Sequence, residues 1–271
     1  MNSPKNESAQ IVGIVLVRDE DIFVGQAVRN IASFCDALIL CDHGSTDGTA
    51  AILDDLACSL PHAAVHRLDH PSESHDLLKG FACTRTWVFG VDGDELYDPR
   101  RLQEFRSRLL AGEFDRIWRM KGNVLHCTSL AADRSTATGH LAPPSRSITK
   151  LYNFGAIASW DGDTVERLHG GTIRFQHGFD DGMKKNLQEE LGWDESPLRC
   201  LHTCFLPRSS RDATRAGTGV RENIMEIYRG GIGGVLRRFA NRILRRQDSR
   251  WKKDFYRRGP AETVDARPFF S

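Results

Sequence analysis

The sequence predicts an α/β protein with a mostly parallel central sheet flanked by helices. Between residues 11 and 58, short apolar runs alternate with segments whose apolar residues recur at helical spacing. Strands that are buried on both faces of a parallel sheet have such continuous apolar runs, and crossover helices join them. A chain of 271 residues is long enough to bury a substantial core. We therefore expect a Rossmann-like arrangement in the first half of the chain.

The elements of this first half follow in a regular order. Apolar runs such as IVGIVLV at 11–17 and ALILC at 37–41 indicate buried strands. The predicted strands are 11–17, 37–41, 63–68 and 86–91. The predicted helices are 22–34, 49–58 and 76–85.

The second half has a less regular pattern. A helix at 99–110 begins with Pro99, where the missing amide proton matters least. Residues 128–144 are polar and small and end in two prolines, so we expect a mobile loop there. The other predicted elements are strands at 115–125, 147–153, 171–175 and 201–206 and a helix at 181–191.

Acidic residues follow three of the predicted strands. They are Asp19 and Glu20 after the first strand, Asp42 after the second, and Asp92, Asp94 and Glu95 after the fourth. Ligands of such sheets bind beyond the carboxyl ends of the strands, so these acids should converge on one crevice. Carboxylates this close repel one another unless a positive charge joins them, and oxygen ligands suit Mg²⁺ or Mn²⁺. An acidic, solvated turn is the alternative interpretation of 92–95.

Three motifs carry a resemblance to a known family. Arg18-Asp19-Glu20, then 41–49 (CDHGSTDGT), then 91–95 (VDGDE) resemble, in this order, the motifs of the family 2 glycosyltransferases of the GT-A fold. The resemblance covers residues 10 to 100 and continues more weakly to 206. It implies a metal-dependent, inverting transferase of the hexosyl or N-acetylhexosaminyl type. The donor would be a nucleotide-diphosphate sugar, most simply a UDP-sugar, with GDP- and dTDP-sugars left open. The acceptor would be a glycan, a lipid-linked molecule or a small molecule.

The resemblance also implies roles for individual residues. Asp94 would bind Mn²⁺ or Mg²⁺, and Asp92 would contact the ribose, or the metal through water. Val17 and the turn from Arg18 to Glu20 would line the base pocket, and Asp42 would bind the nucleoside. The remaining implied contacts are His202 near the metal and Arg208 and Arg211 at the diphosphate. The loop with these arginines could equally be a solvated basic segment.

A general base is expected near residue 166. Inverting transfer needs a carboxylate that takes the proton from the acceptor hydroxyl. Glu166 maps to the base of the family pattern, although Val165 stands where relatives have histidine. This departure leaves Asp163 and Asp161 as rival bases.

Zinc is a further interpretation of the segment 200–204. Alternation along a strand would place Cys200, His202 and Cys204 on one face, and thiolate and imidazole are zinc ligands. A structural core strand is the simpler alternative, because cysteine often packs as a small hydrophobic residue.

The resemblance divides the chain into a tail, a catalytic domain and an extension. The tail is 1–10. The domain is 11–206, with a nucleotide-sugar half (11–100) and an acceptor half (101–206). The arginine-rich loop and helical extension are 207–271. Within the extension, 234–258 is basic with apolar residues on one helical stripe, so it would pack on the domain or contact an anionic membrane.

Composition narrows the class of protein. The net charge is +1 and no aromatic platform accompanies the basic segment, which argues against nucleic-acid binding. Seven scattered cysteines indicate a reducing compartment, and no apolar signal region follows the basic start. We expect a cytoplasmic protein, with peripheral contact to the inner face of the membrane left open.

Other functions fit less well. A dinucleotide oxidoreductase needs a glycine-rich turn after the first strand, and a sugar nucleotidyltransferase needs a glycine-rich basic loop there. This chain has Arg-Asp-Glu-Asp at 18–21 instead. The remaining alternative is a catalytically degenerate module that binds nucleotides or a membrane surface.

Overall fold

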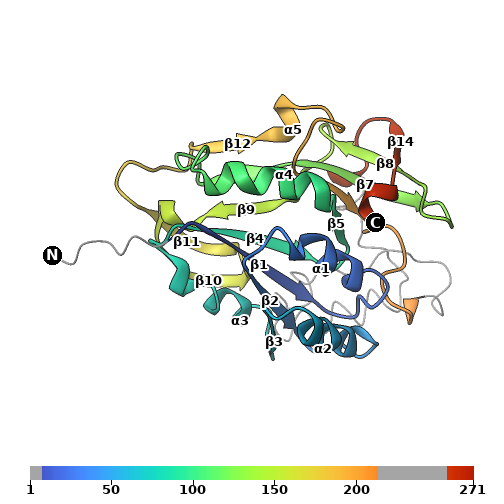
Figure 1. Cartoon of the computed structure of the whole chain (residues 1–271), viewed down its shortest axis with the longest axis horizontal. Coiled ribbons are helices and arrows are strands. Elements are labelled where there is room, and N and C mark those ends of the chain that lie inside the picture. The colour runs from blue at the N-terminus through green and yellow to red at the C-terminus, as the bar shows by residue number, and fades with distance from the viewer. Residues whose placement is uncertain (1–7, 213–254) are drawn as a thin grey trace, which may run out of the picture.

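A computed structural model describes residues 8–212 and 255–271 (Figure 1). A seven-stranded sheet in the order β12-β6-β9-β4-β1-β2-β3 forms the centre, and a five-stranded sheet in the order β14-β8-β7-β13-β5 lies beside it. β10 and β11 form a separate hairpin. The strands of the first sheet are β1 (Gln10–Val17), β2 (Ala37–Asp42), β3 (Ala63–Arg67), β4 (Thr86–Asp92), β6 (Arg119–Lys121), β9 (Lys150–Asn153) and β12 (Lys184–Asn186).

The first half of the chain confirms the predicted parallel sheet. β1 pairs in parallel with β2 on one side and with β4 on the other, and β2 pairs in parallel with β3. The helices α1 (Val24–Ala32) and α2 (Thr49–Ser59) connect these strands, and α4 (Pro99–Leu110) follows. The order therefore reverses direction between β1 and β4, which makes their carboxyl ends the place where a ligand crevice is expected.

One helix of the first half was predicted wrongly. Residues 76–85 do not form a helix; the chain makes the short α3 (Glu73–Asp76) and the 3₁₀ turn η1 (Lys79–Phe81). Cys83 then takes a φ of 64°, and its amide donates to the carbonyl groups of Phe154 and Ile157. This tertiary contact ends the helical path before β4 begins.

The second sheet is mostly antiparallel and was not predicted as a unit. Its strands are β5 (Glu95–Tyr97), β7 (Asn123–Leu130), β8 (Thr136–Ala142), β13 (Arg199–His202) and β14 (Ala261–Asp265). The predicted loop 128–144 is wrong, because β8 pairs with β7 on one side and β14 on the other. The predicted strand 115–125 is broken at Gly122, where a Cβ would collide with the backbone of Leu198.

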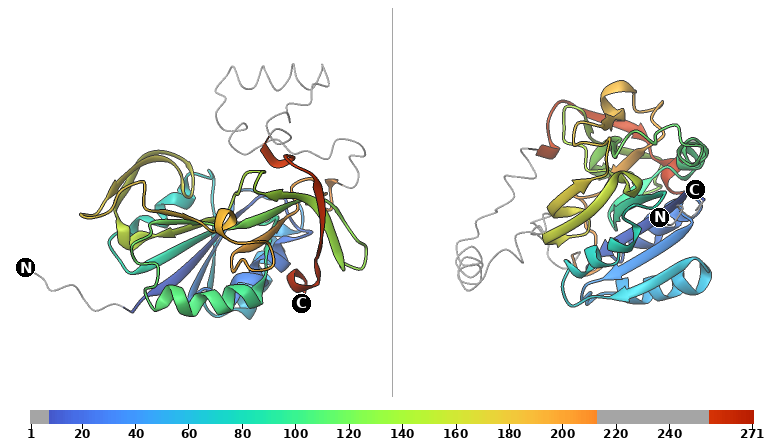
Figure 2. Two further views of the ribbon diagram at one scale, coloured as in Figure 1. Left: turned by 90° about the horizontal axis from the view of Figure 1, so that it is seen from above. Right: turned by 90° about the vertical axis from the view of Figure 1, so that its left-hand side faces the viewer.

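The hairpin packs against the central sheet (Figure 2), and its Trp160 and Leu168 share a buried cluster with Ile14 of β1 and Val88 of β4. It consists of β10 (Ile157–Glu166) and β11 (His169–Phe175), which pair in the antiparallel sense. Only β11 was predicted. The predicted helix 181–191 is reduced to α5 (Leu187–Glu190), because the residues before it pair with β6 as β12.

The end of the chain folds back onto the domain. β14 joins the second sheet and is followed by the 3₁₀ turn η4 (Arg267–Phe269). Asn30 of α1 donates to the carbonyl groups of Tyr97 and Phe269 at 2.7 and 2.9 Å, which fixes this turn against α1. The described end of the predicted helical extension is therefore a strand and a turn. Most of the predicted basic helix, up to residue 254, lies outside the described residues. Within the described part of the chain, no helix is long and apolar enough to cross a membrane.

Candidate active site

The turn between β4 and β5 places the acidic residues at the carboxyl ends of the parallel strands. Asp92 is the last residue of β4 and pairs with Leu16 of β1. A Cβ at Gly93 would lie 2.8 Å from Val17 Cγ1 and would also press on the Glu20 carboxylate. Glycine at 93 is therefore what lets this turn approach the end of β1 so closely.

Asp92 is held by two cations from other parts of the chain. Lys150 Nζ of β9 donates to Asp92 Oδ2 at 2.9 Å, and Arg167 Nη2 donates to Asp92 Oδ1. Burial alone would raise the pKa of Asp92, but Lys150 and Arg167 hold that pKa well below its usual range. Asp92 is therefore a carboxylate with a contact on each oxygen, although its side chain is 34% exposed.

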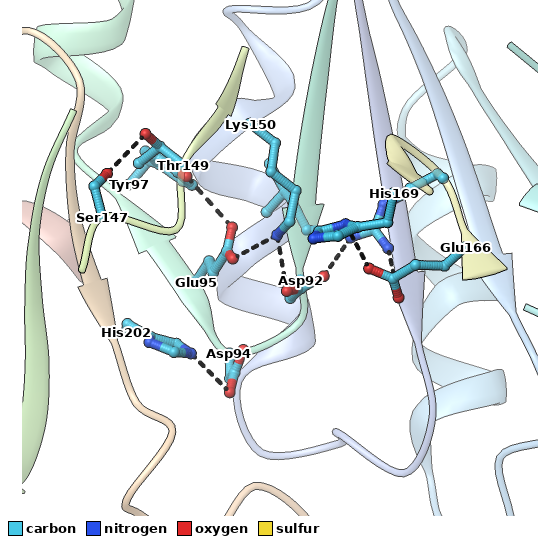
Figure 3. A network of polar contacts seen from close by, with 12 residues as sticks. Asp92, Asp94, Glu95, Tyr97, Ser147, Thr149, Lys150, Glu166, His169 and His202 are labelled. Carbon is cyan, nitrogen blue, oxygen red and sulfur yellow. Dashed lines mark hydrogen bonds and ion pairs between the residues drawn. The ribbon is translucent and has the colours of Figure 1, made fainter. Parts of the chain in front are cut away.

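Lys150 also connects this aspartate to the start of β5. Its Nζ donates to Glu95 Oε1 at 2.9 Å, and the Tyr97 hydroxyl lies 3.3 Å from Glu95 Oε2. Glu95 has no exposed surface, and burial raises the pKa of its carboxyl to about 8 against the opposing effect of Lys150. The three side chains lie together in Figure 3.

Asp94 belongs to a second group of contacts. Arg208 Nη1 lies 2.6 Å from Asp94 Oδ2 and 2.8 Å from Glu20 Oε1. His202 Nε2 lies 3.5 Å from the same Asp94 oxygen. Burial raises the pKa of Asp94, but Arg208 and His202 outweigh it and hold the pKa far below the usual value.

His202 extends this group into the second sheet. Its Nδ1 lies 2.8 Å from Nδ1 of His126 on β7. Burial lowers the pKa of His202, but its contacts with Cys204 and Asp94 raise it to about 10. In this arrangement His202 is an imidazolium that faces Asp94.

The base predicted at residue 166 lies on the other side of Asp92 (Figure 3). Glu166 ends β10, is 8% exposed, and has Arg167 Nη1 at 3.8 Å and His169 Nδ1 at 3.2 Å. Burial raises the pKa of Glu166, but His169 and Arg167 lower it further than burial raises it, so the residue is ionised. The rivals Asp161 and Asp163 are exposed along the same strand.

The carboxyl ends of β1 and β2 lie side by side, because Val17 is paired with Asp42. The Val17 carbonyl accepts a hydrogen bond from the His43 amide at 3.2 Å. Asp42 Oδ1 accepts from the Ser45 amide at 3.0 Å, and Arg67 Nε lies 3.8 Å from Asp42 Oδ2. Arg18 lowers the pKa of His43, after the larger effect of burial, to about 4. Arg18 is therefore close to His43.

The arginine loop is docked on the ends of β1 and β2. The Arg208 carbonyl accepts from the Ile22 amide at 3.1 Å, and the Ser209 hydroxyl donates to Asp47 Oδ2 at 2.5 Å. Arg211 Nη1 donates to the Thr46 hydroxyl at 2.5 Å. Asp47 Oδ1 also accepts from the Thr49 amide, at 2.9 Å, at the start of α2.

Three buried side chains of this candidate site were not predicted from the sequence. Lys150, Arg167 and His126 are buried and contact the acidic residues or His202. A lysine inside the predicted strand 147–153, and an arginine directly after the predicted base, were the only signals. The zinc interpretation was wrong in its partners: Cys204 lies beyond the end of β13, and its neighbours are His126 and His202 rather than Cys200.

The donor atoms around Asp94 fit a divalent cation in part. Asp94 Oδ2 and His202 Nε2 are close enough to share one ion, but Arg208 now contacts that oxygen. An imidazolium cannot ligate a metal, so binding there would also release a proton. Asp92 has both oxygens engaged, which fits a contact through water better than direct ligation.

Comparison with known proteins shows similarity to glycosyltransferases. No family model matches the chain. The chain is 28% identical over 111 residues to the lipopolysaccharide core biosynthesis glycosyltransferase LpsC of Rhizobium meliloti, covering 39% of each chain. It is 23% identical over 199 residues to an uncharacterized glycosyltransferase of Rickettsia conorii, covering 71% of this chain and 64% of the relative. The chain thus spans less than two thirds of the length of these relatives.

A solved structure gives a weaker likeness. It is the mannosyltransferase PcManGT of Pyrobaculum calidifontis in complex with GDP-Man and Mn²⁺, with a TM-score of 0.33 and 16% identity. The match covers 46% of this chain and 37% of that one. Since the superposition is so partial, the α/β assignment stands on the strand order described above.

Proposed function

We propose that this protein is a glycosyltransferase of the GT-A type and of family 2, which transfers a sugar from a nucleotide-diphosphate sugar to an acceptor hydroxyl. The observation that carries the proposal is the acidic turn 92–95 at the point where the strand order reverses between β1 and β4. Similarity to glycosyltransferases in sequence supports the same class. A UDP-sugar of the hexosyl or N-acetylhexosaminyl type is the donor that we favour.

The donor would lie across the ends of β1, β2 and β4. Val17, Arg18 and Glu20 would line the base pocket, and Asp42 would accept a hydrogen bond from the nucleoside. Asp92, already fixed by Lys150 and Arg167, would contact the ribose. Two contacts on its carboxylate keep Asp92 from turning, so it needs no reorganisation when the donor arrives.

Asp94 and His202 would hold Mg²⁺ or Mn²⁺, and Asp92 would reach the ion through water. Such an ion supplies positive charge to the diphosphate as it leaves the sugar. Arg208 contacts Asp94 and Glu20 at the same turn, so its guanidinium is placed to bind the diphosphate there. Arg211 would support it from the same loop.

Glu166 is the base that we propose for inverting transfer. It is an ionised carboxylate beside Asp92, and Arg167 links the two residues. Removing the acceptor proton as the hydroxyl attacks would avoid a charged intermediate. Asp163 is the rival, but it is exposed and lacks such a link to the donor side.

A degenerate binding module is the second candidate. The observation in its favour is that Asp92, Asp94 and Glu95 are all paired with side chains of the protein itself. Such a module would bind nucleotide without turning it over.

Release of nucleoside diphosphate from UDP-, GDP- and dTDP-sugars, with and without Mn²⁺, tests the proposal. We expect metal-dependent release from one donor class, stimulated by an acceptor and lost in Asp94→Asn. Nucleotide binding without turnover of any donor would favour the degenerate module. Release that is equal in wild type and Asp94→Asn would contradict the site.

A further inference from the structure

A buried cluster of metal-binding side chains lies behind the acidic turn. His126 of β7 and His202 of β13 are directly paired in the parallel register of the two strands. Cys204 follows two residues after His202. All three are buried, with exposures of 0%, 6% and 1%. One nitrogen of each ring and the Cys204 sulfur lie within 4.8 Å of one another.

The hydrogen bond behind His126 fixes its tautomer. His126 Nε2 lies 2.9 Å from the Arg146 carbonyl oxygen. A carbonyl only accepts, so Nε2 carries the proton. The neutral ring then directs the lone pair of Nδ1 toward His202, and burial together with His202 keeps the pKa of His126 well below its usual range.

His202 has the matching arrangement. Its Nε2 faces the Asp94 carboxylate at 3.5 Å, and its Nδ1 faces His126 Nδ1 at 2.8 Å. Histidines that bind a metal through one nitrogen commonly donate the other N–H to a carboxylate or a backbone carbonyl. Both rings therefore have the outer partner that this kind of ligand requires. Two Nδ1 atoms at 2.8 Å need a proton or a cation between them.

The distances and surroundings suit a small, borderline-soft ion. Zinc bonds of about 2.0–2.1 Å to nitrogen and 2.3 Å to sulfur place two ligands of a tetrahedral ion roughly 3.3–3.7 Å apart. The present separations, from 2.8 Å to below 4.8 Å, bracket this value. The Tyr256 ring stacks on His126 with centroids 4.3 Å apart and closes one side of the cluster.

We propose that His126 Nδ1, His202 Nδ1 and Cys204 Sγ form a Zn²⁺ site. Two imidazoles and a thiolate select zinc over Mg²⁺ or Mn²⁺. Binding displaces the proton between the two Nδ1 atoms, and the sulfur binds as thiolate. The site goes beyond the proposed transferase and does not depend on it.

Occupation of the site has a consequence for the acidic turn. With Nδ1 bound to zinc, His202 keeps its Nε2 proton and donates to Asp94. In that form His202 would be a positioning residue for Asp94 instead of the Mg²⁺ or Mn²⁺ ligand proposed above, and Asp94 would hold the ion of the transferase without His202. The zinc would join β7, β13 and the chain that leads to Arg208.

Metal content and cobalt spectroscopy test the proposal on the full chain. We expect purified protein to retain about one equivalent of zinc by mass spectrometry. After chelation and loading with Co²⁺, a sulfur-to-cobalt charge-transfer absorption should appear. Cys204→Ala should abolish it and weaken zinc binding by at least about 10-fold. Cys127→Ala is the matched control, because Cys127 is also 1% exposed, and it should keep the absorption.

The outcomes that overturn the site are distinct from failure of sugar transfer. Wild-type protein that holds no zinc and gives no charge-transfer absorption overturns it. So does an absorption that survives in Cys204→Ala or disappears in Cys127→Ala. If Cys204→Ala fails to fold, His126→Gln gives the second test, with reduced zinc affinity expected and unchanged affinity contradicting the site. Asp94→Asn should keep the cobalt spectrum; loss of cobalt binding there alone would move the ion to the acidic turn.

Discussion

Asp92 and Asp94 are separated by one glycine, yet they belong to different parts of the molecule. Asp92 is bound by Lys150 of β9 and by Arg167 at the tip of the hairpin, and through Arg167 it is linked to Glu166. Asp94 is bound by Arg208 and faces His202, which continues to His126 in the second sheet. The turn thus divides the site into an Asp92 side and an Asp94 side.

This difference indicates that the Asp92 side and the Asp94 side have different roles. On the Asp92 side the cations are a lysine and an arginine buried inside the fold, so they serve to fix the carboxylate. On the Asp94 side the arginine comes from a loop that is docked through hydrogen bonds to Ile22 and Asp47. We therefore expect changes on the Asp92 side to affect folding and proton transfer, and changes on the Asp94 side to affect metal and diphosphate.

The largest effect is expected at Glu166. Glu166→Gln keeps the size of the side chain but removes the base, so transfer should fall by about 10²–10⁴-fold with donor binding near normal. Steady-state transfer rates and donor titration measure the two quantities. Asp163→Asn is the control and should transfer normally. An inactive Asp163→Asn beside an active Glu166→Gln would move the base to Asp163.

The second largest effect is expected for Asp94→Asn. Turnover should fall by roughly 10²–10³-fold because the charge on the leaving diphosphate is no longer balanced. Added Mn²⁺ should no longer stimulate release of nucleoside diphosphate. Circular dichroism checks that the fold is retained. Turnover at the wild-type level, with the same metal dependence, would remove Asp94 from the metal site.

Lys150→Met tests whether the contacts of Asp92 stabilise the fold. It removes one of the two cations that hold Asp92 ionised and the donor to the buried Glu95, and removing one partner of a buried pair costs about 3–5 kcal/mol in free energy of unfolding. Urea denaturation measures this loss. Lys79→Met, which removes an exposed lysine, should leave stability unchanged. If both variants have wild-type stability, Lys150 does not hold the turn.

His169→Ala should have the smallest effect. His169 lowers the pKa of Glu166, so its removal lets burial raise that pKa. A base must be ionised to accept a proton, so the acid limb of the kcat/KM profile should move to higher pH. Turnover near neutral pH should change by less than about 10-fold because Glu166 stays in place. His177→Ala, which removes an exposed histidine, should leave the limb where it is, and an unmoved limb in His169→Ala would separate His169 from the base.

The fold of residues 11–100 was predictable because its signals in the sequence are local. The strands β1, β2 and β4 are apolar runs, and an acidic residue at or just after the end of each run marks the strand end in the sequence. Convergence of Asp42, Asp92 and Asp94 then follows from parallel topology alone.

The second sheet and the contacts of the candidate site depend on pairing between segments that are distant in the sequence. The run TATGHLA of β8 lacks a strong strand pattern and is stabilised by β7 and β14, the latter more than a hundred residues away. A lysine or an arginine in a sequence normally indicates an exposed position. The burial of Lys150 and Arg167 could therefore be recognised only from the structure, in which both side chains pair with Asp92. Likewise, nothing local to His126 connects it with His202.

Thermal unfolding with UDP, GDP and dTDP, each with and without Mn²⁺, tests the central claim most directly. A ligand that binds only the folded protein stabilises it by about 2.7 kcal/mol at a hundredfold excess over the dissociation constant. We predict that one nucleotide raises the unfolding temperature, that Mn²⁺ enlarges the rise, and that Asp94→Asn removes the enlargement. No rise with any nucleotide, with or without Mn²⁺, would contradict a sugar-nucleotide site at the 92–95 turn.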